Sequence, residues 1–329
     1  MTEEVGARDA AENVVPITDA NTQPTARPTP HGDKLRELLN NSKLPESDVA
    51  AVRKAIERYN AWIADMTGLE TEGKDRVADL VGLLNDYKEA IEVDLIWDSD
   101  AEFLYRQKGQ LKIDNSILEE WFPWLTDSRI MPELESTTLT VGPAKAFAAA
   151  HFQSTASDSN STPGLVIRSK DQDFTIGRPT YLRSSFDRAF PAGLPDNQET
   201  YIAYIAAELK TNLDKTMFQE AAATSHDLRI ASPGSHYFLI CEYLDMTPIS
   251  SAGTDITEVL VLRAKRTGSQ NRRQYSDPKY RKQNRASHLA ALRARPVRLA
   301  VVQRFVDRVR EILRDQDADL TNAVERGWF

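Results

Sequence analysis

A glutamate and a lysine, separated by one residue, close an apolar run near the middle of the chain. The run covers residues 201–210 and reads Tyr-Ile-Ala-Tyr-Ile-Ala-Ala-Glu-Leu-Lys. Side chains two positions apart in a β-strand point to the same face. If the run ends as a strand, Glu208 and Lys210 therefore share a face, and Leu209 points into the core. The pattern predicts a carboxylate beside an ammonium. The carboxylate would be one of the ligands of a metal site, and the lysine would adjust the charge at that site.

One reaction that needs such a half-site is the hydrolysis of a phosphodiester. An enzyme must lower its barrier by more than about 10 kcal/mol. A divalent cation contributes by lowering the pKa of bound water and by neutralising the phosphoryl oxygens, and Mg²⁺ prefers carboxylates, carbonyls and water. We predict that Asp173 and Glu208 bind Mg²⁺ together with the backbone carbonyl of Leu209. Lys210 is expected to orient the attacking water and to stabilise the transition state.

Other residues compete for these roles. Asp171 lies on the same face of an extended segment as Asp173, and we favour Asp173 because it directly precedes the β-prone stretch Phe-Thr-Ile-Gly. Asp187 is a third candidate. Gln219 follows on the next expected helix, where it either reaches the active-site water or is an exposed helix residue. Glu208 and Lys210 also have a simpler interpretation, a surface ion pair at the end of a strand.

The elements around this run follow the order of a nuclease core. An acidic residue opens a short strand, the strand with Glu-x-Lys follows, and then come a helix and another strand. We predict strands at 164–169, 174–177, 236–244 and 256–262, and helices at 214–228 and 296–314. The expected fold is α/β, with a central mixed sheet flanked by helices.

The N-terminal half has a different character. Residues 1–32 lack periodicity, and we expect disorder there. Apolar residues recur at helical spacing in 48–66 and 74–91, shorter helices are expected at 102–109 and 143–152, and Trp121, Phe122 and Trp124 are expected in a core. The polar stretch 153–162 is a plausible boundary. The expected domains are a disordered tail (1–32), a helical N-terminal domain (33–152) and a nuclease domain (153–329).

Charge is distributed unevenly along the chain. The net charge is −8, but residues 1–150 hold 16 Lys and Arg against 28 Asp and Glu, whereas residues 151–329 hold 25 against 21. Within the second half, segment 263–298 contains 12 Lys and Arg and a single acid, Asp277. This basic segment is expected to be a long loop, either a solvated one or a clamp on DNA phosphates. The candidate DNA-binding residues are Arg178, Arg183, Arg263, Lys265, Arg266, Arg272, Arg273, Lys279, Arg281 and Lys282.

Composition excludes several other classes. No apolar run approaches the roughly 18 residues of a membrane span, and the lone Cys241 cannot form an internal disulfide. We therefore expect a reduced, cytoplasmic protein with no membrane partner. The sequence contains neither a Gly-rich phosphate loop followed by Lys-Ser/Thr nor a Gly-x-Ser-x-Gly elbow, and so does not indicate nucleotide hydrolysis or a serine hydrolase.

Three stretches together resemble a known family. They are Lys-Asp-Gln-Asp-Phe at 170–174, Ala-Glu-Leu-Lys-Thr-Asn-Leu-Asp-Lys-Thr-Met-Phe-Gln-Glu-Ala at 207–221, and residues 237–248. They resemble the type II restriction endonucleases of the Bpu-ten-I family, within the PD-(D/E)xK nuclease superfamily, over roughly residues 164–266. The resemblance implies metal-ligand roles for Asp173 and Glu208 and the lysine role for Lys210. Gln172 departs from the motif, which has proline before the aspartate.

The resemblance implies a Mg²⁺-dependent enzyme that cuts double-stranded DNA within or beside a short specific sequence. Cutting both strands requires two active sites, so we expect a homodimer or a heterodimer with a related subunit. Two alternatives remain. One is a DNA repair or end-specific nuclease on the same core, and the other is a non-catalytic DNA-binding protein whose Glu-x-Lys is only an ion pair.

Overall fold

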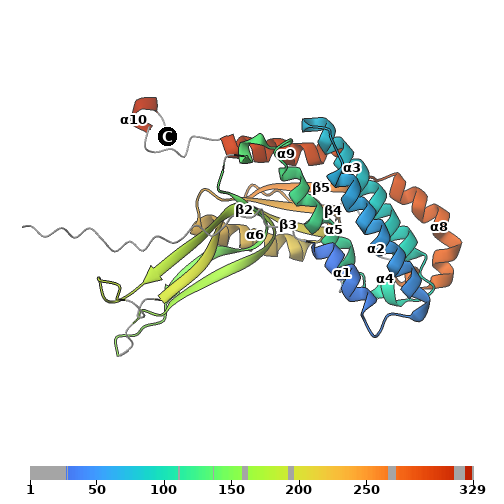
Figure 1. Ribbon diagram of the computed structural model, residues 1–329, viewed down its shortest axis with the longest axis horizontal. Helices are drawn as coiled ribbons and strands as arrows, with labels where there is room; N and C mark the ends of the chain where they lie inside the picture. Colours follow the sequence, from blue (N-terminus) through green and yellow to red (C-terminus); the bar gives the residue numbers. More distant parts are fainter. Residues whose placement is uncertain are drawn as a thin grey trace, which may run out of the picture.

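A computed structural model describes residues 27, 29–109, 112–135, 137–157, 162–191, 196–265, 272–314 and 323–327. Its centre is one five-stranded sheet with helices on both faces (Figure 1). Most of the tail predicted to be disordered at 1–32 lies outside the described residues. None of the described helices is long and apolar enough to cross a membrane.

The sheet is mixed, as predicted. Its strands are β1 (Thr140–Phe152), β2 (Leu165–Ser184), β3 (Asp196–Leu213), β4 (His236–Leu244) and β5 (Ile256–Lys265), and they lie side by side in chain order. The pairs β1–β2 and β2–β3 are antiparallel, whereas β3–β4 and β4–β5 are parallel. A helix connects β3 to β4, because parallel neighbours need a crossover connection.

Helices make up most of the remainder. The N-terminal part contains α1 (Pro30–Leu39), α2 (Glu46–Thr67), α3 (Gly73–Glu89), the π-helix η1 (Ala90–Trp97), α4 (Phe103–Gln107), α5 (Ile113–Trp121) and the 3₁₀ turns η2 (Phe122–Thr126) and η3 (Pro132–Leu134). The C-terminal part contains α6 (Lys215–Ala231), α7 (Arg272–Tyr275), α8 (Pro278–Arg293), α9 (Leu299–Arg314) and α10 (Ala323–Arg326). The side chain of Asp214 begins α6 by accepting a hydrogen bond from the amide of Met217, at 2.9 Å, which satisfies a free donor of the first turn.

The sheet separates two cores. On one face, strand residues such as Phe174 and Leu209 pack against the N-terminal helices and α9. On the other face, residues such as Ala206 and Leu239 pack against Phe218 of α6. The strands alternate between the two cores, which explains why the middle of the sheet is apolar on both sides.

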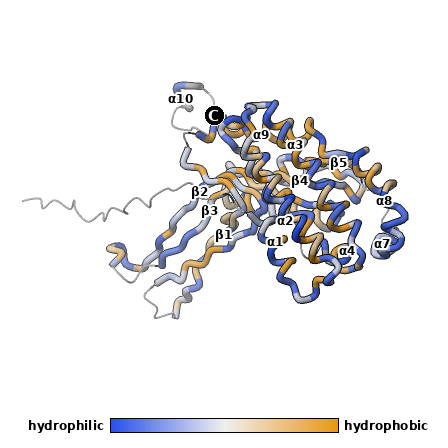
Figure 2. Tube along the Cα trace, turned by 45° about the vertical axis from the view of Figure 1, so that its right-hand side comes forward, coloured by the Kyte–Doolittle hydropathy of each residue, from blue (hydrophilic) through white to orange (hydrophobic). Residues whose placement is uncertain are grey.

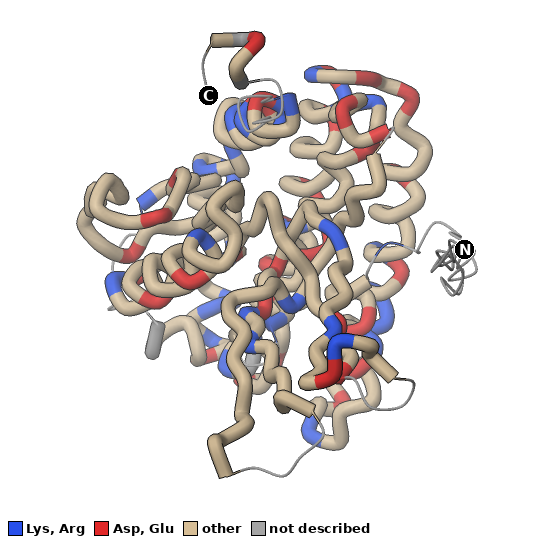
Figure 3. Tube along the Cα trace, turned by 90° about the vertical axis from the view of Figure 1, so that its left-hand side faces the viewer, with Lys and Arg blue, Asp and Glu red and all other residues tan. Residues whose placement is uncertain are grey.

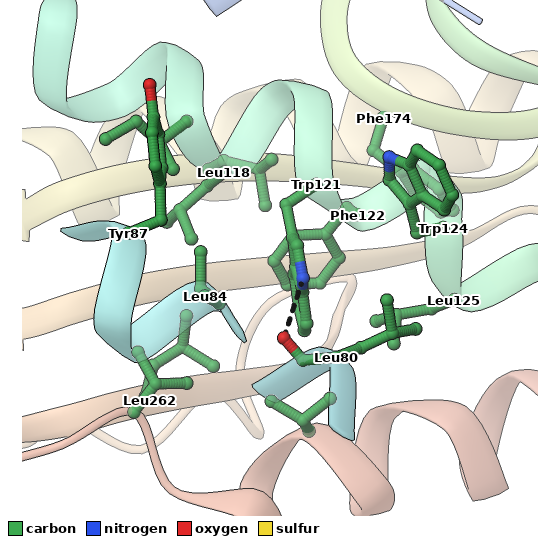
Figure 4. Close-up of a cluster of buried hydrophobic side chains, with 14 of the residues drawn as sticks. Leu80, Leu84, Tyr87, Leu118, Trp121, Phe122, Trp124, Leu125, Phe174 and Leu262 are labelled. Carbon is green, nitrogen blue, oxygen red and sulfur yellow. Dashed lines mark hydrogen bonds between the residues drawn. The ribbon is translucent and has the colours of Figure 1, made fainter. Parts of the chain in front are cut away.

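The larger core joins the helices to the sheet. Figure 4 shows side chains of α3 packed against the aromatic residues that follow α5, with Phe174 of β2 beside them. Trp121 and Phe122 are fully buried, which confirms their predicted place in a core. The indole of Trp121 donates a hydrogen bond to the carbonyl of Leu80, at 3.2 Å. Each large apolar side chain buried in this way contributes about 1.5–3 kcal/mol.

β2 is long and bends sharply. It pairs with β1 from Leu165 to Gly177 and with β3 from Phe174 to Ser184. A Cβ atom at Gly177 would lie 2.1 Å from the carbonyl oxygen of Ile202, so this close approach requires glycine. β1 and β3 lie on opposite edges of β2, yet a parallel bridge joins Ala146 to Tyr201. The curl of β2 therefore brings its two hairpins together, and both project from the body as arms (Figure 1).

Most of the predicted elements are confirmed. Those with a counterpart of the same type are 48–66 (α2), 74–91 (α3), 102–109 (α4), 214–228 (α6), 236–244 (β4), 256–262 (β5) and 296–314 (α9). Two predictions were wrong. Residues 143–152 are not a helix but most of β1, and the basic segment 263–298 is not one long loop, because it contains α7 and α8. The sheet thus begins before residue 153, where the nuclease domain was expected to start.

Candidate active site

The side chain of Asp173 binds the strand that carries Glu-x-Lys. The ladder between β2 and β3 runs from Ser184 and Asp196 to Phe174 and Ala207. One residue beyond its end, Asp173 Oδ2 accepts a hydrogen bond from the backbone amide of Leu209, at 2.8 Å. The Leu209 side chain is fully buried, as predicted. Asp173 is therefore held directly beside the peptide between Glu208 and Lys210.

Glu208 and Lys210 lie on one face, as the strand period predicts. Lys210 Nζ lies 2.6 Å from Glu208 Oε1. The other carboxylate oxygen, Oε2, accepts a hydrogen bond from the hydroxyl of Tyr237 in β4, also at 2.6 Å. The side chains of Glu208 and Lys210 keep 22% and 31% of their exposure, so the pair is partly buried yet accessible to a ligand from solvent.

The electrostatics of the cluster are unusual for a strand end. Burial raises the pKa of Asp173 to about 6, the Leu209 amide opposes the rise, and the negative charges of Glu119 and Glu208 add to it. Burial alone would lower the pKa of Lys210, but Glu208 and Asp173 overcome that effect and the pKa is raised. Burial, followed by the charge of Glu208, raises the pKa of Tyr237. At neutral pH the lysine is charged and the tyrosine remains a donor.

The donor set suits a hard divalent cation. Asp173 is a mostly buried carboxylate whose ionised form is destabilised by burial and by neighbouring acids, and a cation would relieve both effects. Carboxylate and carbonyl oxygens are the ligands that Mg²⁺ prefers. Within the described part of the chain, no group of three or more His, Cys, Asp and Glu residues is arranged to hold a metal. A cation at this site would therefore have two carboxylate ligands, Asp173 and Glu208. Oxygens from the backbone, water or substrate would complete its coordination.

The remaining site candidates lie elsewhere. Asp171 is exposed and stands opposite Lys145 of β1 in the sheet register. Asp187 is exposed in the turn after β2, where Oδ1 accepts a hydrogen bond from the amide of Ala189. Gln219 is exposed on α6, and the α6 residue whose charge acts on Lys210 is its neighbour Glu220. The structure thus brings together Asp173, Glu208 and Lys210.

Two neighbours of the site were not foreseen. Tyr237 sits in β4 and reaches Glu208 from the adjacent parallel strand, and Glu119 acts on Asp173 from α5. A tyrosine inside a buried strand carries no sequence signal of such a contact, because the register between parallel strands cannot be read from one sequence. Glu119 lies outside the stretches that resemble the nuclease family, so nothing linked it to the site.

Two predicted DNA contacts are wrong. Arg263 and Arg281 are 4% and 0% exposed, so neither can reach a phosphate. Arg263 donates a hydrogen bond to Glu242 at 2.8 Å, and Glu242 in turn pairs with Lys88 at 2.6 Å. Arg281 donates to five backbone carbonyls, those of Trp97, Ser99, Ala101, Tyr275 and Ser276.

The basic segment balances the acidic half of the chain. Lys282 pairs with Asp100 at 2.7 Å, and Arg293 pairs with Glu89 at 2.7 Å. Arg285 likewise reaches acids in and beside η1. Figure 3 shows basic and acidic positions interspersed over the helical part. Part of the basic charge of the segment is therefore compensated by acids of the N-terminal half.

The other candidates for DNA contact remain predictions. Lys265, Lys279 and Lys282 are exposed, as are Arg178 and Arg183 on β2. Arg266 lies outside the described residues, and the side chains of Arg272 and Arg273 are likewise not described.

The fold is a mixed α/β sheet in which two acids and a lysine lie where the ladder between the antiparallel strands β2 and β3 ends. This arrangement is that of a restriction-endonuclease fold. A solved structure titled native BbvCI A2B2 tetramer at low resolution is similar, with a TM-score of 0.51 and 20% identity over 86% of this chain and 96% of that chain. The chain also matches the Bpu10I restriction endonuclease family over residues 110–329. It belongs to that family and is a type II restriction enzyme. No match was found among curated proteins.

The match confirms the predicted resemblance to the Bpu-ten-I family and extends it. The resemblance was expected over roughly residues 164–266, whereas the family covers residues 110–329. The added part includes α5 with Glu119, β1 and the C-terminal helices. The family therefore spans the whole sheet and part of its helical cover.

Proposed function

We propose that this restriction enzyme hydrolyses double-stranded DNA at a short specific sequence in a Mg²⁺-dependent reaction, with Asp173, Glu208 and Lys210 as its catalytic residues. The observation that carries the proposal is the contact of Asp173 with the Leu209 amide at 2.8 Å. It holds one acid beside the Glu208–Lys210 pair in a partly buried, accessible site. A surface ion pair would not require this second acid.

The residues have distinct roles. Asp173, Glu208 and the Leu209 carbonyl would hold Mg²⁺, which supplies Lewis-acid stabilisation and lowers the pKa of bound water. Lys210 remains protonated, because its pKa is raised by the two acids. It therefore orients the attacking water and stabilises developing charge on the phosphoryl oxygens, rather than accepting a proton. Removing one such donor typically costs about 10²–10³ in rate.

Cleavage of both strands needs two such sites. We therefore propose a homodimer or a heterodimer with a related subunit, since each chain brings one site. The similar BbvCI structure is titled as an A2B2 tetramer, which supports an assembly of more than one kind of subunit. Double-stranded DNA is the proposed substrate, and a cytoplasmic location remains a prediction.

The test is cleavage of plasmid DNA with Mg²⁺ and with a chelator. The wild-type protein should give discrete fragments only with Mg²⁺, whereas Glu208→Ala and Lys210→Ala should give none. Glu57→Ala and Lys54→Ala, which replace exposed residues of α2, are matched controls and should cut normally. Equal cutting by all variants would refute the site. Degradation that starts from DNA ends would instead indicate a repair nuclease, and binding without any cleavage would indicate a non-catalytic protein.

A further inference from the structure

One of the two arms is a two-stranded ribbon with unusual exposure. We call it the β2–β3 arm, and it comprises residues 178–191 and 196–202. Its strands pair from Arg178 and Ile202 to Ser184 and Asp196, beyond the part of β2 that pairs with β1. Figures 1 and 2 show it projecting from the body. The bridge between Ala146 and Tyr201 fixes its base against the other arm.

One face of the β2–β3 arm, which carries Tyr181, Arg183 and Glu199, is open to solvent, whereas the face with Thr180 and Thr200 is partly buried. Among its described residues, only Thr200 is buried, although an antiparallel sheet usually packs one face on a core. Large apolar side chains are nevertheless exposed there, with Tyr181 at 73%, Phe186 at 61% and Phe190 at 40%. Exposed aromatic groups on a projecting element indicate a surface that binds something.

The arm also carries exposed arginines. In the described parts of the chain, Arg178, Arg183 and Arg188 form no ion pair, whereas Lys282, Arg285 and Arg293 of the basic segment do. Arg178 lies on one face of the ribbon and Arg183 on the other, because they are five positions apart in a strand. Each face of the arm therefore carries an exposed arginine.

Hydrogen bonds hold both strands of the arm near its outer end. Arg183 donates a hydrogen bond to the carbonyl of Phe190, at 3.0 Å, and its guanidinium lies 5.2 Å from the centre of the Phe190 ring. Asp196 is occupied by the amides of Gly164 and Leu165. Of the other acids in the described part of the arm, Asp187 accepts a hydrogen bond from the Ala189 amide, and Glu199 forms no ion pair or side-chain hydrogen bond with a described residue. The described part of the arm thus carries three arginines and three acids, so attraction of an anion is local to the exposed arginines.

These features fit a DNA groove. The major groove admits a two-stranded β-ribbon, arginine binds guanine through two hydrogen bonds, and Asn or Gln binds adenine. Arg178, Asn197 and Gln198 offer such groups on the arm. Apolar side chains such as Tyr181 can contact the thymine methyl group. A second protein chain would be a poorer match, because covering the exposed face would bury Arg183, which forms no ion pair with a described residue.

The arm and the candidate active site lie at opposite ends of the ladder between β2 and β3. Arg178 and Arg183 follow Asp173 by five and ten residues along β2. At about 3.3 Å per residue and about 3.4 Å per base pair, their backbone positions lie about 5 and 10 base-pair lengths along the strand from that of Asp173. We propose that the β2–β3 arm inserts into the major groove of DNA and reads base edges beside the cut. This inference rests on the proposed function.

The test is a binding selection that does not depend on cleavage. The Lys210→Ala protein selects duplexes from a random pool, and the selection is repeated with Arg178→Ala or Tyr181→Ala added. Arg53→Ala, an exposed arginine of α2, is the matched control, and equal unfolding midpoints establish intact folding. The expected result is a loss of preference at particular base positions, by about 5- to 100-fold per lost contact, for the arm variants only.

Methylation of guanine N7 on a selected duplex gives the second measurement. The arm should protect guanines in the major groove within about 10 base pairs of the cut, and Arg178→Ala should remove part of this protection. An unchanged base preference with unchanged protection would overturn the inference. So would arm variants that change only the mass of the assembly, because they would assign the arm to a protein contact. A wild-type protein that binds through the arm but never cuts would refute only the proposed catalysis.

Discussion

The hydroxyl of Tyr237 lies 2.6 Å from Glu208 Oε2 and donates a hydrogen bond to it. Tyr237 is 2% exposed, so its ring is fixed by the core and holds the carboxylate in one orientation. We expect Tyr237→Phe to raise the Mg²⁺ concentration for half-maximal cleavage by about 10- to 100-fold, the usual cost of losing an outer hydrogen bond to a metal ligand.

The control for this experiment is Tyr243→Phe, which removes a hydroxyl from the same strand next to Arg263. It should leave the Mg²⁺ requirement unchanged. A Tyr237→Phe enzyme with a wild-type Mg²⁺ titration would show that the hydroxyl does not position Glu208.

The raised pKa of Asp173, about 6, predicts a pH-dependent metal requirement. Only the ionised carboxylate binds a cation, so protons compete with Mg²⁺ below that pKa. The Mg²⁺ concentration for half-maximal cleavage should rise by up to about tenfold for each pH unit below 6 and stay level above it. Titrations at several pH values would check this, and a requirement that is flat down to pH 5 would contradict it.

The same shift predicts that Asp173 destabilises the metal-free fold. Its folded pKa lies above the ordinary value of 3.8, so the folded state binds the proton more tightly than the unfolded chain. The protonated Asp173 therefore stabilises the folded state at low pH, and this contribution to the free energy of unfolding is lost as the pH rises through about 6. Asp173→Asn should therefore raise the free energy of unfolding at pH 7.5 by about 1–2 kcal/mol, as measured by urea denaturation in a chelator. Equal free energies of unfolding for the wild-type and Asp173→Asn proteins would show that the pKa of Asp173 is not raised in the folded state.

Gly177 sets the bend of β2. A Cβ atom there would meet the Ile202 carbonyl at 2.1 Å, whereas nothing lies within 4 Å of a Cβ built at Gly82 in α3. Gly177→Ala should cost about 3 kcal/mol or more through backbone displacement. Gly82→Ala should stabilise the protein by about 0.5–1 kcal/mol, because it removes a helix glycine. Thermal unfolding of both variants checks the contrast, and a tolerated Gly177→Ala would show that the bend does not depend on glycine.

A buried ion pair ties the helical part to the sheet. Lys88 of α3 and Glu242 of β4 are both fully buried and lie 2.6 Å apart. Lys88→Met should cost about 3–5 kcal/mol, because it removes one partner of a buried charge pair. Lys282→Met breaks an exposed pair with Asp100 and should have no measurable effect. Denaturant unfolding measures the free energy of unfolding of both variants. Similar losses in the two would show that the buried pair is no more important for stability than the exposed one.

Local patterns in the sequence were sufficient for much of the fold. Helical spacing located α2, α3 and α9, and the strand period placed Glu208 and Lys210 on one face, because these regularities depend on residues near each other in the chain. Two elements escaped this reasoning. The alanine-rich stretch of β1 has a helical preference that pairing with β2 overrides. The sequence contains a helix-start signal at α8, because Asp277 directly precedes Pro278. In the structure Asp277 accepts a hydrogen bond from the Lys279 amide. The many charged residues of this segment nevertheless led to its prediction as a loop.

The sequence by itself determined the family resemblance and the mixed α/β fold, and it singled out Glu208, Lys210 and the alternatives Asp171 and Asp173 as candidates. Only the tertiary structure decided what each charge meets. It buried Arg263 against Glu242, enclosed Arg281 among carbonyls, and left Arg178 exposed on a projecting ribbon. Pairing of distant charges depends on how helices and strands pack together, and no spacing along one chain encodes that arrangement.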